Sequence, residues 1–275
     1  MPELPELEVI KQTIKPLVVG KGVKGLRILK PYILKSYFNG DLSGETIEGI
    51  TRRGKYLEFQ LTSHKIYIHL MLHGSVAYVS PSVKTKKTAN ALLVLEDGAT
   101  IEFSEKTTKK RMSIYIKSED ESLPRIENLG IDPLSKEFTV HELGKLLRSD
   151  RKQLKTFLCR QNKIAGIGNA YADEILWKAG LSPFKPSTNL SGQETEQLHH
   201  AIINVLRWAI QNASHTRRLD KRDFLRIHGK KCVPCPKCGG TIRTVSFSQS
   251  DTFYCPTCQT GGHKLKDRRL SKFYR

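Results

Sequence analysis

The sequence lacks a run of about 18 consecutive apolar residues, which excludes a membrane-spanning helix of ordinary length. Its beginning also lacks a basic segment followed by an apolar stretch, so we expect no secretory signal and a cytoplasmic location. Neither internal repeats nor low-complexity segments occur. With 38% hydrophobic and 27% charged residues, the composition is that of a soluble globular protein.

Acidic residues are scarce relative to basic ones. The chain has 46 Lys and Arg residues against 27 Asp and Glu residues, a formal net charge of +19 and a pI of about 9.7. This excess is far larger than solubility requires, and nucleic acid is the usual polyanion that such a surface binds, because neutralised phosphates release their counterions. An anionic membrane is the weaker alternative, since no strongly amphipathic basic helix supports it.

The first part of the chain has the pattern of β-structure. A length of 275 residues predicts one large domain or two to three smaller ones. In 65-KIYIHLML-72, aliphatic residues occupy every second position, which is the period of a β-strand. The stretch 55-KYLEFQL-61 has the same period of two. The apolar face of the first stretch comprises Ile66, Ile68, Leu70 and Leu72. The β pattern extends over residues 22–118.

Turn and linker signals bound these strands. The Asp-Gly pair at 97–98 predicts a hairpin between 91-ALLVLE-96 and 99-ATIEFS-104. Several short strands of this kind predict a β-sandwich or a flattened barrel. The polar stretch 119–138, which contains two prolines, is typical of a linker.

The next block is helical. Thr139-x-x-Glu142 and Ser191-x-x-Glu194 each have the form of a capping box, and apolar residues at helical spacing follow both. The second helix is expected to continue through 198–210.

Five of the six cysteines lie near the end of the chain. Cys235-Pro-Lys-Cys238 and Cys255-Pro-Thr-Cys258 are two matching knuckles, separated by 16 residues. Each knuckle offers two thiolates from one tight turn, which predicts one tetrahedral Zn²⁺ site. Because sulfur fills all four positions, this zinc is structural and takes no part in chemistry. Two disulfides are the disfavoured alternative, since the chain is expected in a reducing compartment.

Two cysteines remain outside this pattern. Cys232 also lies three positions before Cys235, so a shifted ligand register is open. The repeated Cys-Pro-x-Cys form favours Cys235 and Cys238, and leaves Cys232 and Cys159 as free thiols.

A glycine-rich turn lies in the middle of the chain, in 163-KIAGIGNAYADEILWKAG-180. Gly166, Gly168 and Asn169 stand at the entry to a predicted helix, where backbone N–H groups suit a phosphate. Alone, this pattern is also typical of an ordinary helix–helix turn. In a chain this basic, with Lys155 nearby in the sequence, phosphate binding is the preferred interpretation.

The chain begins with MPELPELE, which on its own predicts the start of a helix. Glutamates in a first turn complement the helix dipole, and proline is tolerated there.

Together, MPELPE, KIAGIGNAYADEILWKAG and the paired Cys-Pro-x-Cys knuckles resemble, in this order, the formamidopyrimidine-DNA glycosylase family, which includes the endonuclease VIII-like enzymes. Further matches are 52-RRGKYL-57, 69-HLMLHG-74 and 129-LGIDPLSKEF-138. The resemblance spans nearly the whole chain. It implies an α+β, multidomain protein: an N-terminal helix plus β-sandwich at 1–132, a helix-two-turns-helix domain at 133–229, and a zinc finger with a basic tail at 230–275.

The resemblance also implies a catalytic mechanism. The initiator methionine is removed, and the secondary amine of Pro2 attacks the sugar C1′ of a damaged nucleotide, displaces the base and forms an iminium; elimination then cleaves the strand. Glu3 is implied as the acid that opens the sugar ring, and Glu6 assists proton movement or positions the amine. Glu8 belongs to the motif without a definite role. Lys55 is implied to contact DNA near the lesion and to assist elimination.

DNA-binding residues follow from the same matches. Lys155 and Asn169 are implied to bind phosphates, His69 is expected to do the same, and Leu72 is implied to fill the space left by an extruded base. The partner is damaged DNA, duplex or single-stranded, and we expect a monomer.

Three departures from the family pattern concern lesion choice. The arginine that the family's finger carries five residues before the third cysteine is Ser250 here, and Arg243 is a possible substitute. The stretch 105-EKTTKK-110 replaces the segment that supplies two intercalating side chains, so only Leu72, or Met71 in a shifted register, remains. The third departure is that the longer segment which closes over a flipped purine in 8-oxoguanine-excising members is missing after Phe224.

We therefore expect a bifunctional DNA glycosylase and AP lyase of base-excision repair with weak or absent 8-oxoguanine excision. The alternative is a catalytically weak protein of the same fold that binds damaged DNA or abasic sites.

Overall fold

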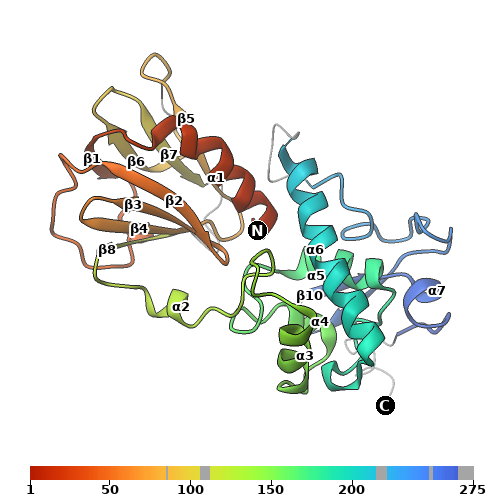
Figure 1. The fold of residues 1–275 in the computed structure, drawn as a ribbon. Helices are drawn as coiled ribbons and strands as arrows, with labels where there is room; N and C mark the ends of the chain where they lie inside the picture. The colour runs from red at the N-terminus through yellow and green to blue at the C-terminus, as the bar shows by residue number, and fades with distance from the viewer. Residues whose placement is uncertain (85, 106–111, 215–221, 248–249, 266–275) are drawn as a thin grey trace. The chain divides into compact units, whose positions relative to one another are not determined.

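The computed structural model describes residues 1–84, 86–105, 112–214, 222–247 and 250–265 (Figure 1). Two compact units form. The first comprises Met1–Leu129 with Ala213–Lys221, and the second comprises Gly130–Asn212 with Arg222–Arg275. The division into three domains at 132/133 and 229/230 stays a prediction, because the second unit holds both the helical block and the finger.

The first unit contains one long helix and two antiparallel four-stranded sheets. One sheet has the strand order β1-β6-β7-β5 and the other β2-β3-β4-β8. The helix is α1 (Leu4–Val18), and the strands are β1 (Val23–Ile28), β2 (Ile47–Arg53), β3 (Tyr56–Leu61), β4 (His64–His69), β5 (Gly74–Val79), β6 (Ala89–Leu95), β7 (Thr100–Glu105) and β8 (Ser113–Ser118). A short 3₁₀ turn spans Pro31–Ile33.

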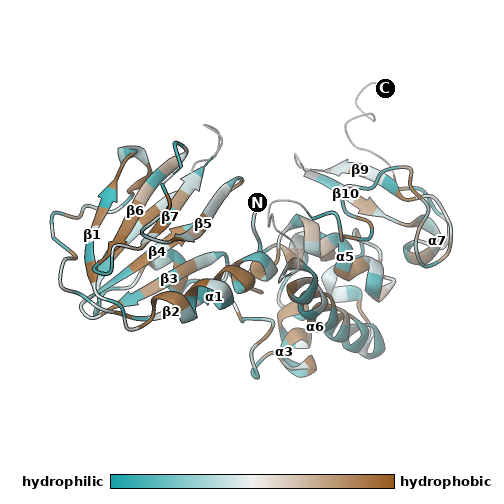
Figure 2. Ribbon diagram, turned by 90° about the horizontal axis from the view of Figure 1, so that it is seen from above, coloured by the Kyte–Doolittle hydropathy of each residue, from teal (hydrophilic) through white to brown (hydrophobic). Residues whose placement is uncertain are grey.

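The core of this unit lies between the two sheets. Hydrophobic and hydrophilic residues both occur along the strands (Figure 2), and the predicted alternation is present in β3, where Leu57, Phe59 and Leu61 belong to the core. Phe59 of β3 and Phe103 of β7 are both fully buried and meet edge to face with 6.0 Å between ring centroids. Because burying one such side chain contributes roughly 1.5–3 kcal/mol, this contact between the sheets is a main stabilising element of the sandwich.

Helix α1 contacts β2 and β5, which are edge strands of the two different sheets, and also β3 (Figure 1). Its apolar side packs into the same core, through Leu7, Ile10 and Ile14. The helix therefore spans the open side of the sandwich, and this packing fixes the helix start relative to the strands.

The predicted hairpin at 97–98 is confirmed, since β6 and β7 pair as antiparallel neighbours. The predicted alternation through Leu72 is wrong at its end, because β4 stops at His69. Met71 has a φ of 49°, a left-handed conformation that turns the chain, and the N–H of Gly74 donates to the carbonyl of Leu70 at 2.9 Å. A Cβ on Gly74 would lie 2.5 Å from that carbonyl oxygen, so the turn requires glycine there.

The stretch expected to be a linker is partly ordered against the sandwich. It contains the short helix α2 (Pro124–Glu127). Leu123 and Ile126 are buried against Tyr56 and Tyr67. This packing anchors the beginning of the stretch to the sheet β2-β3-β4-β8.

The second unit contains helices and one β-hairpin. The helices are α3 (Val140–Arg148), α4 (Leu154–Leu158), α5 (Asn169–Ala179), α6 (Gly192–Ser214) and α7 (Pro256–Gln259), with a 3₁₀ turn at Ser187–Asn189, and β9 (Arg243–Phe247) pairs with β10 (Ser250–Tyr254). The predicted capping box at the start of α6 is confirmed, because the Ser191 N–H also donates to the Glu194 carboxylate at 2.9 Å. At the start of α3 only the N-cap half of the predicted box forms, since the Thr139 N–H donates to the carbonyl of Glu137. The hydroxyl of Thr139 accepts from the Glu142 N–H at 3.2 Å, and that of Ser191 accepts from the Glu194 N–H at 3.1 Å.

The described helices include none that is both long enough and apolar enough to cross a bilayer.

Candidate functional site

The acidic start of the chain folds as the first turn of α1. Glu3 is the N-cap residue, and its N–H donates to the Glu6 carboxylate at 2.8 Å, so that the two residues form a capping box. Both carboxylates are almost fully buried, whereas Pro2 is half-buried and Met1 is 41% exposed. The first turn therefore holds two acidic side chains in fixed positions directly beside a reachable Pro2.

Arg52 connects this helix to the turn that carries Lys55. Its Nε donates to Glu8 Oε2 at 3.1 Å, and its Nη1 donates to the carbonyl of Gly54 at 3.2 Å. The arginine side chain is only 5% exposed. Burial alone would raise the pKa of Glu8, but the hydrogen bonds and charges of Lys11 and Arg52 outweigh it and lower that pKa. Glu8 thus stays charged and holds the β2–β3 turn to α1.

Lys55 is buried at 9% exposure in this turn, and it lies near His69 at the end of β4. Burial, followed by the positive charges of Lys55 and Arg125, lowers the pKa of His69 to about 4. His69 Nδ1 accepts the N–H of Met71 at 3.1 Å, so the ring proton of the neutral histidine sits on Nε2. Tyr56 packs against the ring with 4.8 Å between centroids.

The turn after His69 distinguishes between Met71 and Leu72. Met71 occupies the left-handed position, with φ 49°, and Leu72 follows it as a half-buried side chain. The family pattern His-Leu-Gly-Met has glycine at the position of Met71, which is the residue type that the left-handed conformation favours. The left-handed backbone at Met71 agrees with the register in which Leu72 is the predicted intercalating residue.

A basic hollow of about 660 Å³ lies in the second unit and brings Lys155 and Asn169 together. Four of the ten residues that line it are basic, and none of the ten is acidic: the four are Arg151, Lys152, Lys155 and Arg160. Asn169 is exposed at the first position of α5, behind a turn in which Gly166 has φ 93°. This arrangement combines positive charge with the start of an 11-residue helix, which suits an anionic group.

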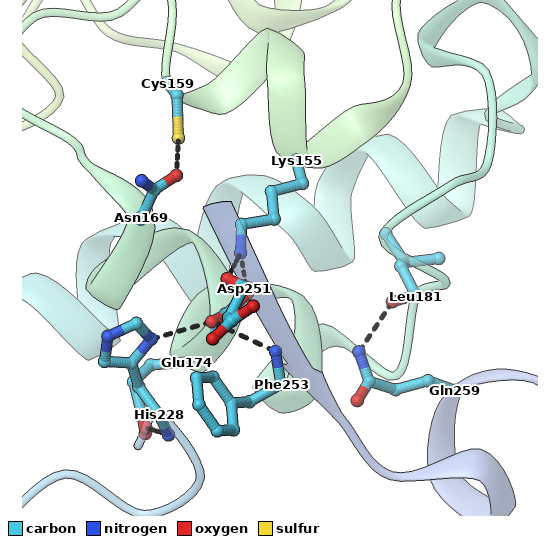
Figure 3. A network of polar contacts seen from close by, with 10 residues as sticks. Lys155, Cys159, Asn169, Glu174, Leu181, His228, Asp251, Phe253 and Gln259 are labelled. Atoms are coloured by element: carbon cyan, nitrogen blue, oxygen red, sulfur yellow. Dashed lines mark hydrogen bonds and ion pairs between the residues drawn. The ribbon is translucent and has the colours of Figure 1, made fainter. Parts of the chain in front are cut away.

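Lys155 is not a freely exposed lysine of this hollow. Its side chain is 7% exposed, and its ammonium lies 2.7 Å from the Asp173 carboxylate. It also donates to the carbonyl of Asp251 on β10 at 2.7 Å (Figure 3). The second oxygen of Asp173 lies 2.7 Å from His228 Nδ1 and accepts the N–H of Phe253 at 3.2 Å. One buried carboxylate thus links α4, α5, the segment before the finger and the finger hairpin.

The short segment after Phe224 is tightly packed. The neighbouring Glu174 accepts the N–H groups of Ile227 and His228 at 2.8 and 2.9 Å. Burial raises the pKa of Glu174, and these backbone donors oppose that rise. Arg226 lies over the ring of Trp208 at 4.3 Å from the centroid. The chain therefore runs directly into the finger, with no longer loop between Phe224 and Ile227.

The four predicted zinc ligands converge. Within the described residues, Cys235, Cys238, Cys255 and Cys258 form a group whose sulfur atoms all lie within 4.8 Å of one another. A tetrahedral zinc with Zn–S bonds of about 2.3 Å needs sulfurs about 3.8 Å apart, and the Cys235–Cys258 and Cys238–Cys255 sulfur distances are 3.9 and 3.5 Å. The thiolate set fits zinc, and the finger holds one structural zinc. Cys232 is exposed and lies outside the group.

The finger is attached to α5 and the chain after it. The indole N–H of Trp177 donates to Cys235 Sγ at 3.2 Å, and Gln259 Nε2 donates to the carbonyl of Leu181 at 2.9 Å (Figure 3). Ile227 and Ile242 complete a small buried cluster around Trp177.

Two of the sequence departures concern residues or side chains outside those that the structure describes. Residues 106–110 of 105-EKTTKK-110 lie outside the described residues, as does the side chain of Ser250. Four residues of the site escaped the sequence analysis: Arg52, Arg125, Asp173 and His228. Arg52 and Asp173 stand inside motifs that the sequence analysis had already quoted, and this was the available signal.

Comparison with known proteins agrees with this geometry. Residues 1–112 match the formamidopyrimidine-DNA glycosylase N-terminal domain, residues 129–220 match the formamidopyrimidine-DNA glycosylase H2TH domain, and residues 234–261 match the zinc finger found in FPG and IleRS. Formamidopyrimidine-DNA glycosylase of Geobacillus kaustophilus is 32% identical over 273 residues, covering 94% of this chain and 100% of the relative. The Enterococcus faecalis enzyme of the same name is 32% identical over 283 residues, covering 98% of this chain and all of the relative.

Solved structures give the same picture. The Lactococcus lactis Fpg in complex with abasic-site DNA superposes with a TM-score of 0.85 at 28% identity, covering 94% of this chain and 99% of that one. The wild-type Lactococcus lactis Fpg bound to DNA containing an oxidised pyrimidine also has a TM-score of 0.85 at 28% identity, covering 94% of this chain and 100% of that one.

Proposed function

Because the chain belongs to the formamidopyrimidine-DNA glycosylase family and is a DNA glycosylase of base-excision repair, we propose that it acts through Pro2 as both glycosylase and AP lyase. Removal of Met1 exposes the secondary amine of Pro2. An α-amino group has an unperturbed pKa near 7.7–8.0, so part of it is unprotonated at neutral pH, unlike a lysine side chain.

The reaction proceeds through a covalent intermediate. The Pro2 nitrogen attacks the sugar C1′, the C1′–base bond breaks, and the base leaves with its electron pair and a proton. Glu3 protonates the ring oxygen as the sugar opens, which gives the iminium. The positive iminium acidifies the C2′ hydrogen; its removal expels the 3′ phosphate by elimination, and water later releases the sugar from Pro2.

One observation carries this proposal: the capping box that holds Glu3 and Glu6 buried beside the half-buried Pro2. A helix start needs no acid at this depth, because exposed glutamates complement the dipole equally well. Burying two acids beside an N-terminal amine is what proton transfer at that amine and at the sugar requires. Lys55, tied to the same helix through Arg52 and Glu8, supplies a cation for the phosphate at the lesion.

The DNA contacts extend to both units. His69 offers a neutral Nε2–H donor, Leu72 fills the space of the extruded base, and Lys155 and Asn169 bind phosphate in the basic hollow. The related Lactococcus lactis structures with abasic-site DNA support damaged DNA as the partner. The protein acts as a monomer on duplex or single-stranded damaged DNA, and its short segment after Phe224 disfavours 8-oxoguanine as a substrate.

Borohydride trapping on abasic-site DNA tests the proposal. We expect a covalent adduct in which the mass of the trapped peptide places the sugar on Pro2, and a mature chain that begins at Pro2. A Pro2→Gly variant keeps an N-terminal amine and tests how far the proline ring positions that amine. A chain with an added N-terminal residue should form no adduct. Equal trapping of a chain that retains Met1 would contradict the assignment of the nucleophile, and tight binding without trapping would favour a binding protein.

A further inference from the structure

We propose that Asp173 is a positioning residue: it holds the Lys155 ammonium and the finger hairpin together, so that Lys155 presents an oriented donor to a DNA phosphate in the basic hollow. This inference rests on the proposed function, since it names how one phosphate of the DNA is held.

The contacts of Asp173 support a joining role. Its side chain is 0% exposed, and its two oxygens contact groups from three other parts of the unit. These groups are Lys155 of α4, His228 of the segment before the finger, and the N–H of Phe253 on β10. A carboxylate buried this deeply is stable only when its charge is compensated, so its partners are held in place as well.

The geometry at Lys155 supports a donor role. An ammonium has three N–H donors. The Asp251 carbonyl accepts one, and the Asp173 carboxylate lies at ion-pair distance. At least one donor is left, and Lys155 lines the hollow together with Asn169 and Thr252. A lysine fixed by two acceptors loses little further side-chain entropy when it binds a phosphate.

The electrostatics separate this lysine from its neighbours. Lys155 and Asp173 form a pair without net charge. The attraction of the hollow for DNA therefore comes mainly from exposed basic side chains such as that of Lys152. Lys155 then contributes direction, and Lys152 contributes charge. Removing Lys155 alone would also leave the Asp173 carboxylate buried without its main cation, which combines two effects in one variant.

A double-mutant cycle separates the two effects. Lys155→Met removes only the ammonium, Asp173→Asn removes only the charge of the carboxylate, and the double variant removes both. We expect each single change to lower the unfolding temperature by roughly 5 °C or more, and the double variant to recover most of that loss. The exposed pair Lys145 and Glu142, at 2.7 Å, is the matched control, and it should show no coupling.

DNA binding provides the readout that a structural role would not move. For an abasic-site duplex, Kd should be several-fold weaker in Lys155→Met and stay weak in the double variant, because the phosphate has lost its oriented donor. The slope of log Kd against log salt should change less in the double variant than in Lys152→Met, since the Lys155–Asp173 pair carries no net charge. In Asp173→Asn the salt slope should stay near its wild-type value, because Lys155 is still present. The Kd should be several-fold weaker, because Lys155 is no longer oriented. Lys152→Met should lose about 1 in slope without any loss of unfolding temperature.

Two results would overturn the inference. Additive effects on the unfolding temperature would show that Asp173 does not hold Lys155. Recovery of wild-type affinity in the double variant would show that Lys155 is structural only. If the wild-type protein itself failed to bind or cleave abasic-site DNA, the proposed function would fail instead, and the stability cycle would still report on the pair.

Discussion

Arg52 reaches from the end of β2 to Glu8 on α1, with 3.1 Å between its Nε and Glu8 Oε2, and the same guanidinium donates to the carbonyl of Gly54. Glu8 lies little more than one helical turn beyond Glu3, and Gly54 directly precedes Lys55. The pair therefore connects the two segments that carry the proposed nucleophile and the proposed lysine of elimination. Both side chains are largely buried, at 5% and 12% exposure, so solvent screens the contact only weakly.

We predict that Arg52→Gln lowers single-turnover cleavage of abasic-site DNA by about 10–100-fold with little change in Kd, because Lys55 would no longer be held relative to α1. The neighbouring Arg53 is the control: its side chain is 63% exposed, and Arg53→Gln should cleave nearly as wild type. Equal losses in the two variants would mean that general positive charge, and not positioning, is responsible.

The zinc centre makes a second prediction. Cys235→Ser should release the metal and disorder the finger, because three thiolates hold zinc far more weakly than four. Metal content measured by atomic emission should fall from one zinc per chain, and the fluorescence of Trp177 should change, since its indole contacts Cys235. Cys232→Ser should leave both measurements unchanged; metal loss from that variant would favour the shifted register.

A third prediction concerns pH. The folded pKa of His69 is about 4, below its ordinary value of 6.5. The unfolded chain therefore binds this proton more readily, and the stability that depends on neutral His69 is fully present above pH 6.5 and is lost as the pH falls toward 4. The unfolding free energy of both proteins should fall from pH 7.5 to pH 4.5. We expect the fall in His69→Asn to be about 2 kcal/mol smaller than the fall in wild type.

Urea unfolding at the two pH values measures this difference. Asn keeps an acceptor for the N–H of Met71 but has no proton to gain. His73→Asn is the matched control, because His73 is exposed in the same turn. The same pH dependence in His69→Asn and in wild type would show that His69 does not titrate as its surroundings indicate.

The turn after β4 gives a fourth prediction. Leu72→Ala should slow removal of a base by about tenfold, since the space left by extrusion would stay unfilled, while abasic-site cleavage should hardly change. Met71→Ala changes the residue just before Leu72, which has the left-handed φ of 49°, and it should leave base removal nearly unchanged. A larger effect of Met71→Ala in single-turnover assays would assign the intercalating role to Met71.

The fifth prediction is about lesion choice. We expect slow or absent excision of 8-oxoguanine paired with cytosine, with hydantoins and formamidopyrimidines intermediate and abasic sites fastest. Extruding a well-stacked pair costs a few kcal/mol, and this chain runs from Phe224 to Ile227 without the longer segment that would contact the flipped purine. Single-turnover cleavage of these duplexes side by side checks the order. Similar rates on 8-oxoguanine and abasic duplexes would show that another part of the chain reads the purine.

Much of this fold could be predicted from the sequence because its signals are local. The N-cap at Thr139, the capping box at Ser191, the hairpin at 97–98 and the four zinc ligands each depend on residues close together in the chain, or on a repeated spacing. Such patterns act through backbone geometry and ligand chemistry, which a few neighbouring residues decide. The family assignment followed from the same short motifs.

The tertiary structure decided which side chains meet across long separations in the chain. Glu8 and Arg52, Lys55 and His69, and Lys155 and Asp251 come together only when strands and helices have packed. Their partners determine whether a charge is buried, paired or free, and no spacing in the sequence encodes that. For this reason Lys155 was predicted as a simple phosphate ligand, whereas the folded chain pairs it with a buried carboxylate.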